Sequence, residues 1–406
     1  MKKYIFFIRD YNDWDNIGPI IYYLAKNTSS KISICFYKKD LRKTALYKYL
    51  DKTVGNNLEI FLWRPKKLSL FINYIKNFFF KILSKINLMK ISVPIFEISE
   101  DVLKDWFKKI SISKFTKLII VFDRTLGSIT SKVSKNLKGQ NSVFISCSHG
   151  PQTNVNRLCY VHEMETSQRK KELLKYFEKY KYLIISDYLE LEFNDKFINS
   201  NINEKQIDKS RIAVLGSLRY SSEWIKHIDE FTPRLIKKNN NKKNVVLFMK
   251  KFTENVFKEE VYRTVQIFKS FTNIDFYIKP HTRGMQFFSK INAENIHIIY
   301  DNSSTELINM ADVILFYGGT GIILEALSKK KLVACLDYLD CNRNIYEYFN
   351  ACHNLRCRDD LYYFLNSIIK NNKNIISGDK LLKEIVYARD PSSKVSDRFI
   401  KFFENL

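Results

Sequence analysis

One pattern recurs along most of the chain: a short, uninterrupted apolar run is followed by a stretch with helical periodicity. The runs LIIVF (residues 118–122) and YLIIS (residues 182–186) show no alternation of apolar and polar residues, which is typical of strands buried on both faces. Buried strands that alternate with helices form βαβ units, and such units build parallel sheets. The pattern therefore predicts an α/β fold.

The expected strands fall into two groups separated by a polar linker. The first group comprises residues 4–8, 32–37, 58–62, 118–122, 143–146, 182–186 and 213–215. The second group comprises residues 245–249, 275–278, 296–300, 313–316 and 332–336. Between them, residues 237–243 (KKNNNKK) have the composition of an exposed linker.

These groups predict two Rossmann-like domains that face a cleft. We expect an N-terminal domain at residues 1–236, a C-terminal domain at residues 237–390 and a final helical segment at residues 391–406 that packs back on the N-terminal domain. The first helix is expected at residues 17–25, directly after the first strand and its loop.

The net charge of the chain restricts the classes of partner that it is expected to bind. The 406-residue chain has 67 lysines and arginines against 43 aspartates and glutamates, a formal net charge of +24 at pH 7. Such a charge suits nucleic acid, an anionic membrane surface or an anionic small molecule. The sequence contains no zinc-finger spacing, arginine-rich arm or RNA-recognition motif. We therefore expect no nucleic-acid partner, while anionic small molecules and anionic lipid both stay open.

Residues 68–90 (LSLFINYIKNFFFKILSKINLMK) form an amphipathic helical pattern with interleaved lysines. A basic amphipathic helix suits the surface of an anionic membrane. The alternative is a long helix that packs its apolar face on the domain, and Phe78, Phe79 and Phe80 favour it slightly because they spread apolar area around the helix. Peripheral association with the inner face of a membrane is thus an open expectation.

The compartment is expected to be the cytoplasm. The seven cysteines form no CxxC pair, so neither a zinc site nor a disulfide framework is indicated. Arg9 and Asp10 interrupt the apolar N-terminal run too early for a signal peptide. No run of 18 uncharged apolar residues occurs, so no spanning helix is expected.

A glycine-rich turn follows the strand at residues 313–316. There Gly318, Gly319 and Thr320 precede a new helix. Glycines allow close approach of a ligand, and a helix start offers free N–H groups. Thr320 can cap the helix or donate its hydroxyl to a phosphate, and Glu325 can accept from ribose hydroxyls. An ordinary tight turn would explain two glycines, but hardly the three glycines (Gly318, Gly319 and Gly321) together with a threonine. We therefore favour anion binding.

A basic cluster is expected at the end of another strand. The sequence FYIKPHTRG places Lys279, His281 and Arg283 around Pro280, which ends the strand. Doubly wound folds bind ligands at the carboxyl ends of their strands. Three hydrogen-bond donors at that edge suit a diphosphate or a phosphomonoester.

The KPHTRG motif and the later block DVILFYGGTGIILEALSKKKLV together resemble the C-terminal half of GT-B-type glycosyltransferases. The resemblance is closest to bacterial surface-polysaccharide transferases that use cytidine-linked donors: sialyltransferase-like, Kdo-transferase-like and teichoic-acid glycerol-phosphate transferases. In these families a His-Pro motif and a Ser/Thr- or Gly-rich turn contact the nucleotide phosphates. Here proline precedes His281, Thr282 stands where a proline commonly follows, and residues 318–320 read Gly-Gly-Thr.

The resemblance also implies a role for the turn VLGSLRYSSEW. In such folds the corresponding loop reaches the cleft between the domains, so Ser217 and Arg219 are candidates for binding donor phosphate. A capped turn before a helix explains the same residues equally well.

The catalytic base is expected in the N-terminal half, where two places qualify. His149 matches the His-Gly that follows a strand in the glycerol-phosphate transferases, and histidine titrates near neutral pH. Asp13 and Asp15 match the N-domain carboxylate of sialyltransferase-like enzymes, although Asp15 equally suits a helix cap. Asp13-Trp14-Asp15 is formally a DxD motif, but it follows the first strand, so we predict no metal and no cofactor.

The resemblance implies a glycosyltransferase of bacterial surface polysaccharide synthesis (capsule, lipopolysaccharide or a teichoic-acid-like polymer). It would transfer a sugar or polyol-phosphate from a CMP- or CDP-linked donor to a hydroxyl of a glycan or lipid-linked glycan. One alternative is a relative of the UDP-GlcNAc 2-epimerases, which would show carboxylates beside the glycine turn, where the sequence has only Glu325. Another is a non-enzymatic basic binder of membranes or nucleic acid.

Overall fold

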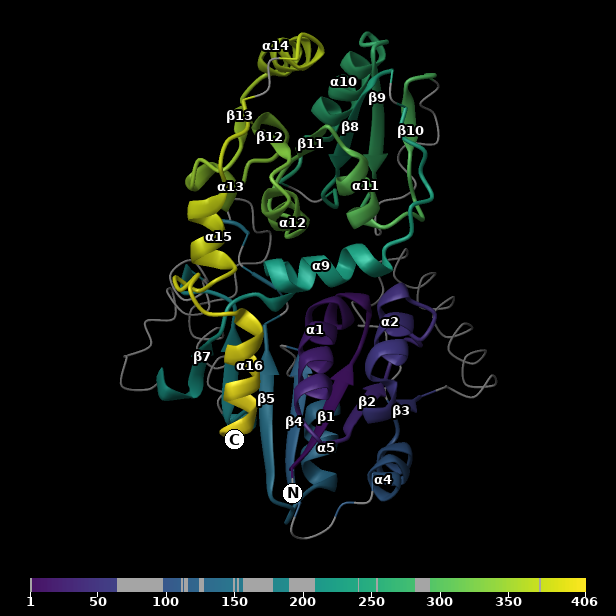
Figure 1. Cartoon of the computed structure of the whole chain (residues 1–406), viewed down its shortest axis with the longest axis vertical. Coiled ribbons are helices and arrows are strands. Elements are labelled where there is room, and N and C mark those ends of the chain that lie inside the picture. Colours follow the sequence, from purple (N-terminus) through teal and green to yellow (C-terminus); the bar gives the residue numbers. More distant parts are fainter. Residues whose placement is uncertain are drawn as a thin grey trace, which may run out of the picture. The chain divides into compact units, whose positions relative to one another are not determined.

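The computed structural model describes residues 2–63, 98–110, 112, 116–123, 128–148, 150–151, 153–155, 178–189, 209–239, 241–252, 255–281, 293–371 and 374–406. Within these ranges the chain forms two parallel β-sheets with helices in most of the connections between successive strands (Figure 1). The predicted α/β class is confirmed. The amphipathic segment at residues 68–90 lies outside the described residues, as do His149, Thr282 and Arg283.

The first sheet has seven strands in the order β3-β2-β1-β4-β5-β6-β7. Its strands are β1 Lys2–Ile8, β2 Ile32–Phe36, β3 Leu58–Leu62, β4 Lys117–Asp123, β5 Ser142–Cys147, β6 Tyr182–Ile185 and β7 Ile212–Val214. In the centre Phe6 pairs in parallel with Ile34 on one side and with Val121 on the other. The strand order reverses at β1, so the switch point of this sheet lies between β1 and β4.

The helices of the first part of the chain are α1 Tyr11–Asn27, α2 Ala45–Val54, α4 Glu100–Lys109 and α5 Ser128–Asn136, with a short 3₁₀ turn η1 at Gly55–Asn57. The expected start of the first helix near residue 17 is wrong, because α1 begins at Tyr11. Asp10 caps it: its carboxylate accepts the N–H of Asn12 at 3.1 Å. Asp15, for which a capping role was weighed, therefore lies inside α1.

The second sheet has six parallel strands in the order β10-β9-β8-β11-β12-β13. Its strands are β8 Lys243–Phe248, β9 Ile274–Lys279, β10 Ile296–Ile298, β11 Val313–Phe316, β12 Leu332–Leu336 and β13 His353–Leu355. The switch point lies between β8 and β11, because β9 and β10 continue to one side of β8 and β11–β13 to the other.

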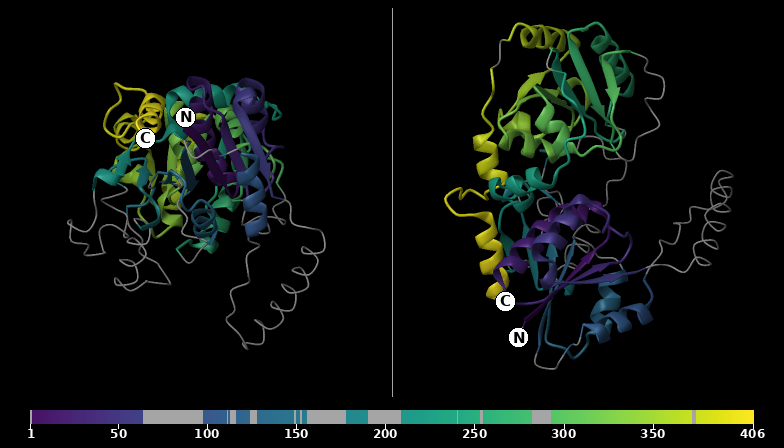
Figure 2. Two further views of the ribbon diagram at one scale, coloured as in Figure 1. Left: turned by 90° about the horizontal axis from the view of Figure 1, so that it is seen from below. Right: turned by 45° about the vertical axis from the view of Figure 1, so that its right-hand side comes forward.

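Helices cover both faces of this sheet (Figure 2). Helices α10 Lys258–Lys269 and α14 Arg358–Ile369 share one apolar core with the strands. On the other face lie α11 Ser304–Met310, α12 Ile322–Ser328, α13 Ile345–Tyr348 and α15 Asp379–Ile385. Alternate residues of β11 point to opposite cores, so Ile314 and Phe316 belong to one cluster and Val313 and Leu315 to the other.

Further helices and 3₁₀ turns complete the described part of the chain. They are η3 Lys209–Arg211, η4 Leu218–Tyr220, α9 Ser222–Phe231, η6 Asp337–Leu339 and the C-terminal helix α16 Val395–Glu404. The ring of Phe402 on α16 packs edge-on against Tyr182 of β6 at 5.6 Å. The N–H of Ser396 donates to the carboxylate of Glu223 on α9 at 3.0 Å. The C-terminal helix thus contacts β6 and α9.

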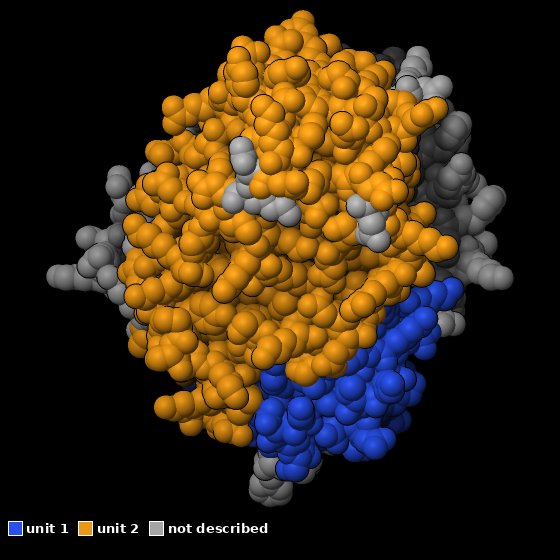
Figure 3. Space-filling view, turned by 45° about the horizontal axis from the view of Figure 1, so that its top comes forward, with its two compact units in different colours: residues 1–149, 179–181 blue, residues 150–178, 182–406 orange. Residues whose placement is uncertain are grey.

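By compactness the chain divides into two units (Figure 3), which are residues 1–149 with 179–181, and residues 150–178 with 182–406. Strands β1–β5 belong to the first unit, whereas β6, β7 and the whole second sheet belong to the second. The predicted domain boundaries (1–236, 237–390 and 391–406) stay a prediction. Among the described residues, no helix combines the length and the hydrophobicity needed to cross a bilayer.

Phe268 offers a test of the second sheet's core. Its ring stacks on Phe276 of β9 with centroids 4.1 Å apart, and both side chains are fully buried. We expect Phe268→Ala to lower the free energy of unfolding by about 3–5 kcal/mol, because it leaves a cavity. In urea melts Tyr363→Ala, at an exposed position of α14, should change it by less than about 0.5 kcal/mol. Equal effects of the two variants would contradict this packing.

Candidate functional site

Polar side chains gather at the carboxyl end of the second sheet, at its switch point. Lys250 follows β8, Gly318 follows β11 and Asp340 follows β12 by four residues. The ammonium of Lys250 lies 2.7 Å from one carboxylate oxygen (Oδ2) of Asp340. In open α/β sheets this edge is where ligands bind.

Asp340 is held from several sides. Its second carboxylate oxygen, Oδ1, accepts the side-chain amide of Asn255 at 2.7 Å and the backbone N–H of Asn342 at 2.8 Å. The residue is buried, and a buried carboxylate is stable only when it is paired and hydrogen-bonded. The Lys250–Asp340 pair therefore has a fixed geometry.

The glycine turn is closely packed against this pair. Gly318 has a φ of +66°, a left-handed conformation that favours glycine. A Cβ at this position would lie 2.3 Å from Oδ2 of Asp340 and 2.6 Å from Cδ of Lys250. At Gly319 a Cβ would lie 2.4 Å from the Oδ1 atom of Asn154. Gly318 is therefore favoured by both its backbone conformation and its close neighbours, whereas a side chain at Gly319 would displace Asn154.

Asn154 reaches the turn through a short segment that follows β5 in the chain. Asn154 and Asn344 form an isolated antiparallel bridge. The N–H of Val155 donates to the carbonyl of Arg343 at 3.0 Å, and the N–H of Ile345 donates to the carbonyl of Thr153 at 3.1 Å. The segment that follows the predicted base His149 thus contacts the glycine turn through Thr153 and Asn154.

Thr320 does not cap the helix that follows it. The N-cap of α12 is Gly321 rather than Thr320. The backbone carbonyl of Thr320 accepts the hydroxyl of Tyr346 at 2.6 Å, which fixes the end of the turn. Whether its own hydroxyl binds phosphate stays a prediction.

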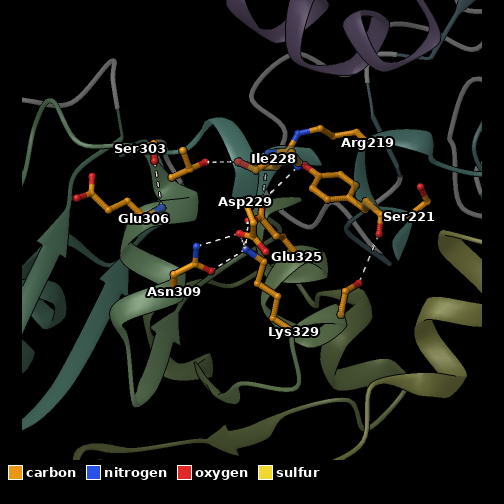
Figure 4. Close-up of polar contacts among 12 residues, drawn as sticks. Arg219, Ser221, Ile228, Asp229, Ser303, Glu306, Asn309, Glu325 and Lys329 are labelled. Atoms are coloured by element: carbon orange, nitrogen blue, oxygen red, sulfur yellow. Dashed lines mark hydrogen bonds and ion pairs between the residues drawn. The ribbon is translucent and has the colours of Figure 1, made fainter. Parts of the chain in front are cut away.

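Two predicted donor-binding residues meet in a buried ion pair (Figure 4). Both terminal guanidinium nitrogens of Arg219 donate to the same carboxylate oxygen of Glu325 at 3.2 Å, and Glu325 is fully buried. The ammonium of Lys329 lies 3.2 Å from the other oxygen of Glu325 and 2.6 Å from Asp229 of α9. Asn309 completes the network by hydrogen bonds to Asp229 and Lys329.

The other predicted donor-binding residues with described placement are Ser217, Lys279 and His281. Ser217 is buried, and its N–H donates to the carbonyl of Val386 at 2.9 Å. The ammonium of Lys279 donates to the backbone carbonyls of Tyr300 and Asn302, and burial lowers its pKa. His281 is half-buried beyond the end of β9.

A second charged cluster lies at the switch point of the first sheet. Arg9 follows β1, Asp13 lies in the first turn of α1 and Asp123 ends β4. One terminal guanidinium nitrogen of Arg9 (Nη2) is 3.6 Å from a carboxylate oxygen of Asp13 and 3.6 Å from one of Asp123. The backbone N–H of Arg9 also donates to Asp13 at 3.0 Å.

This environment shifts the titration of Asp13. Burial, and next the charge of Asp123, raise the pKa of Asp13 to about 7, while Arg9 partly opposes them and Asp10 adds to the rise. The phenol of Tyr37 faces the same cluster, and burial together with Asp13 raises its pKa as well. A carboxylate with a pKa near neutrality is suited to accept a proton at physiological pH.

Sequence reasoning identified Asp13 but missed Asp123, Lys250 and Asp340. Asp123 carries a signal in hindsight, because it closes the apolar run LIIVF. Lys250 and Asp340 carry none that is local, since their partnership spans 90 residues. Among the residues with described placement, no group of three or more His, Cys, Asp or Glu side chains is arranged to hold a metal ion. The absence of a metal from the reaction stays a prediction.

No protein-family model matches the sequence, and neither does any curated protein. Solved structures do match. A UDP-GlcNAc 2-epimerase from Neisseria meningitidis bound to UDP-GlcNAc is 13% identical with a TM-score of 0.51, over 100% of this chain and 99% of that one. The wall teichoic acid polymerase TagF is 10% identical with a TM-score of 0.53, over 99% and 87%. Anabaena HepE in complex with UDP and glucose is 8% identical with a TM-score of 0.54, over the full length of both.

The chain has the GT-B fold. This confirms the fold class predicted from the sequence, in which two parallel-sheet α/β domains follow one another. The GT-B neighbours are nucleotide-sugar enzymes and include both glycosyltransferases and epimerases. At such low identity the likeness shows the fold alone.

The Arg219–Glu325 pair can be tested by stability. Glu325→Met should lower the free energy of unfolding by about 3–5 kcal/mol, because it leaves the buried guanidinium of Arg219 without its counter-ion. The double variant Arg219→Met/Glu325→Met should be more stable than Glu325→Met, as measured by chemical denaturation. Lys109→Ala, which breaks an exposed ion pair with Asp105, is the control and should cost less than about 1 kcal/mol. A double variant no more stable than Glu325→Met would contradict the burial of an unpaired charge.

Asp13 gives a pH-dependent prediction. Its pKa is about 7 in the folded chain against 3.8 for the ordinary group, so between these values the folded state binds more protons and stability falls as pH rises. We expect Asp13→Asn to gain stability over the wild type by on the order of a few kcal/mol from pH 4 to pH 8. Asp15→Asn, two residues along α1, should change stability by less than about 0.5 kcal/mol at both pH values. A pH-independent difference for Asp13→Asn would refute the raised pKa.

Proposed function

We propose that this chain is a glycosyltransferase of bacterial surface polysaccharide synthesis that uses a nucleotide-linked donor, with CMP- or CDP-linked donors favoured. The acceptor would be a hydroxyl of a glycan or lipid-linked glycan, and the enzyme would act in the cytoplasm, at the inner face of the membrane. The observation that carries the proposal is the carboxylate of Asp13, which titrates near neutrality at the switch point of the first sheet.

The proposed reaction moves one group and one proton. The carboxylate of Asp13 takes the proton of the acceptor hydroxyl, and the acceptor oxygen attacks the donor's transferred carbon, or its phosphorus if a polyol-phosphate is transferred. The bond from that atom to the nucleotide's phosphate oxygen breaks, and its electron pair stays on the phosphate. Asp15 and His149 are the alternative bases from the sequence. Asp13 is favoured because it is buried beside Arg9 and Asp123 at the switch point, where its pKa is raised to about 7.

The leaving phosphate needs positive charge or N–H donors. His281 and Arg283, with the backbone of residues 318–320, are proposed to supply them without a metal or another cofactor, as preorganised donors do. The sequence also predicts Lys279, Ser217 and Arg219 for this role, and Glu325 as an acceptor from ribose hydroxyls. In the structure Lys279 donates to two backbone carbonyls and Arg219 pairs with Glu325, so these four are proposed to shape the site rather than to hold the phosphate.

A second candidate function is supported by one observation. An epimerase of this fold would be expected to show carboxylates beside the glycine turn, and Asp340 packs against Gly318. Epimerase structures are also among the neighbours. Incubation with UDP-GlcNAc and no acceptor separates the two functions, because an epimerase turns over alone.

The first experiment is a thermal-shift titration with CMP, CDP, UMP, UDP, GDP and ADP, with and without magnesium. A ligand at 100 times its dissociation constant adds about 2.7 kcal/mol of stability, which is a readable shift. We expect a magnesium-independent shift with a cytidine nucleotide, retained in Asp13→Asn, because the proposed base does not hold the nucleotide.

Other outcomes have distinct meanings. A shift with a uridine or guanosine nucleotide alone would discard the cytidine donor and keep a nucleotide-sugar enzyme. A shift that requires magnesium would contradict the metal-free mechanism. No shift with any nucleotide would refute the proposed function and favour a non-enzymatic basic binder.

A further inference from the structure

Three lysines stand at the carboxyl end of the central strands of the second sheet, and the structure distinguishes them. Lys279, at the end of β9, donates to the backbone carbonyls of Tyr300 and Asn302. Lys251 is exposed. Lys250 is largely buried, with 19% of its side chain exposed, and lies against the glycine turn. Lys250 therefore differs from Lys251 in burial, although the two side chains carry the same charge.

We propose that Lys250 binds the donor's diphosphate and that Asp340 is its positioning residue. This inference rests on the proposed function, since it names the residue that would recognise the phosphates of that substrate. The ligand class is a nucleoside diphosphate or its sugar or polyol ester.

The first argument is position. Lys250 lies two residues beyond the end of β8, and Gly318 lies two residues beyond the end of β11. Both therefore border the point where the strand order reverses. Ligands of doubly wound sheets bind at this point. A ligand that contacts the backbone of the glycine turn would lie next to the ammonium, because the Nζ atom is 3.2 Å from where a Cβ of Gly318 would stand.

The second argument is preorganisation. The aliphatic part of Lys250 packs against Gly318, and its backbone carbonyl accepts the hydroxyl of buried Tyr317 at 3.3 Å. Asp340 fixes the ammonium at 2.7 Å and is itself fixed by Asn255 and Asn342. An ammonium has three N–H donors, of which Asp340 accepts one. A side chain already ordered in this way loses little conformational entropy when it binds an anion.

The third argument is charge. Before the ligand arrives, Asp340 compensates the charge of a lysine that is mostly removed from water. When the donor bond breaks, negative charge develops on the leaving phosphate, and a fixed ammonium stabilises that charge without reorganisation. Asp340 acts through Lys250 and does not itself touch the reacting atoms.

The test compares binding of CDP and UDP by isothermal titration in the full chain. Lys250→Ala should weaken whichever diphosphate the wild type binds by about 10- to 100-fold, the value of a charge-assisted hydrogen bond. Lys250→Gln keeps most of the stem that packs on Gly318 and should show the same loss if Lys250→Ala folds poorly. Lys251→Ala removes an equal charge at the exposed neighbour and should stay within about twofold.

Two further readouts separate phosphate binding from a structural role. Lys250→Arg should recover part of the affinity, and Lys250→Gln should reduce the salt dependence of binding, whereas a purely structural change would lower the melting temperature and leave the salt dependence intact. Wild-type affinity in a folded Lys250→Gln variant would overturn the inference and leave the proposed function standing. If the wild type bound neither diphosphate but did bind CMP, the role of Lys250 would be overturned and the proposed function would stand. If it bound no nucleotide at all, the proposed function would fail, and the role of Lys250 with it.

Discussion

Strands that are buried on both faces restrict where charged side chains can lie in this chain. The centres of both sheets are apolar from one face to the other, as in β1 and β11, and a charge placed there would lose its hydration without a partner. Charged groups must therefore stand at the strand ends. In a parallel sheet all carboxyl ends meet at one edge, and the reversal of strand order leaves room there for side chains.

The charged groups at this edge differ between the two sheets. In the first, the carboxylates of Asp10, Asp13 and Asp123 surround the single guanidinium of Arg9. Burial, and next the negative charge of Asp123, raise the pKa of Asp13. In the second, Lys250 and Asp340 form an ion pair beside Gly318, whose left-handed conformation favours glycine.

The fold could be predicted from the sequence because its signal is local. Each buried strand is a continuous apolar run, and β4 extends the run predicted at residues 118–122 by one residue at each end. The start of α1 was misplaced because three aspartates lie close together, and sequence alone does not show that Asp10 adopts the extended conformation of a cap. The charged partnerships could not be predicted, because Lys250 and Asp340, or Asp13 and Asp123, become neighbours only through tertiary packing.

Glu325 lies where the sequence predicted, but its contacts differ from the predicted ones. Sequence reasoning placed it one turn into the helix after the glycine turn, where it could accept from ribose hydroxyls, and α12 does hold it there. Its two oxygens, however, face the guanidinium of Arg219 and the ammonium of Lys329. A ribose hydroxyl would have to share those oxygens with two cations that are themselves mostly buried, and loss of either pairing is costly. Because Arg219 lies in η4 and Glu325 in α12, their pair holds the start of α12 in place, and with it the glycine turn that α12 follows. The carboxylate thus fixes the position of the glycine turn.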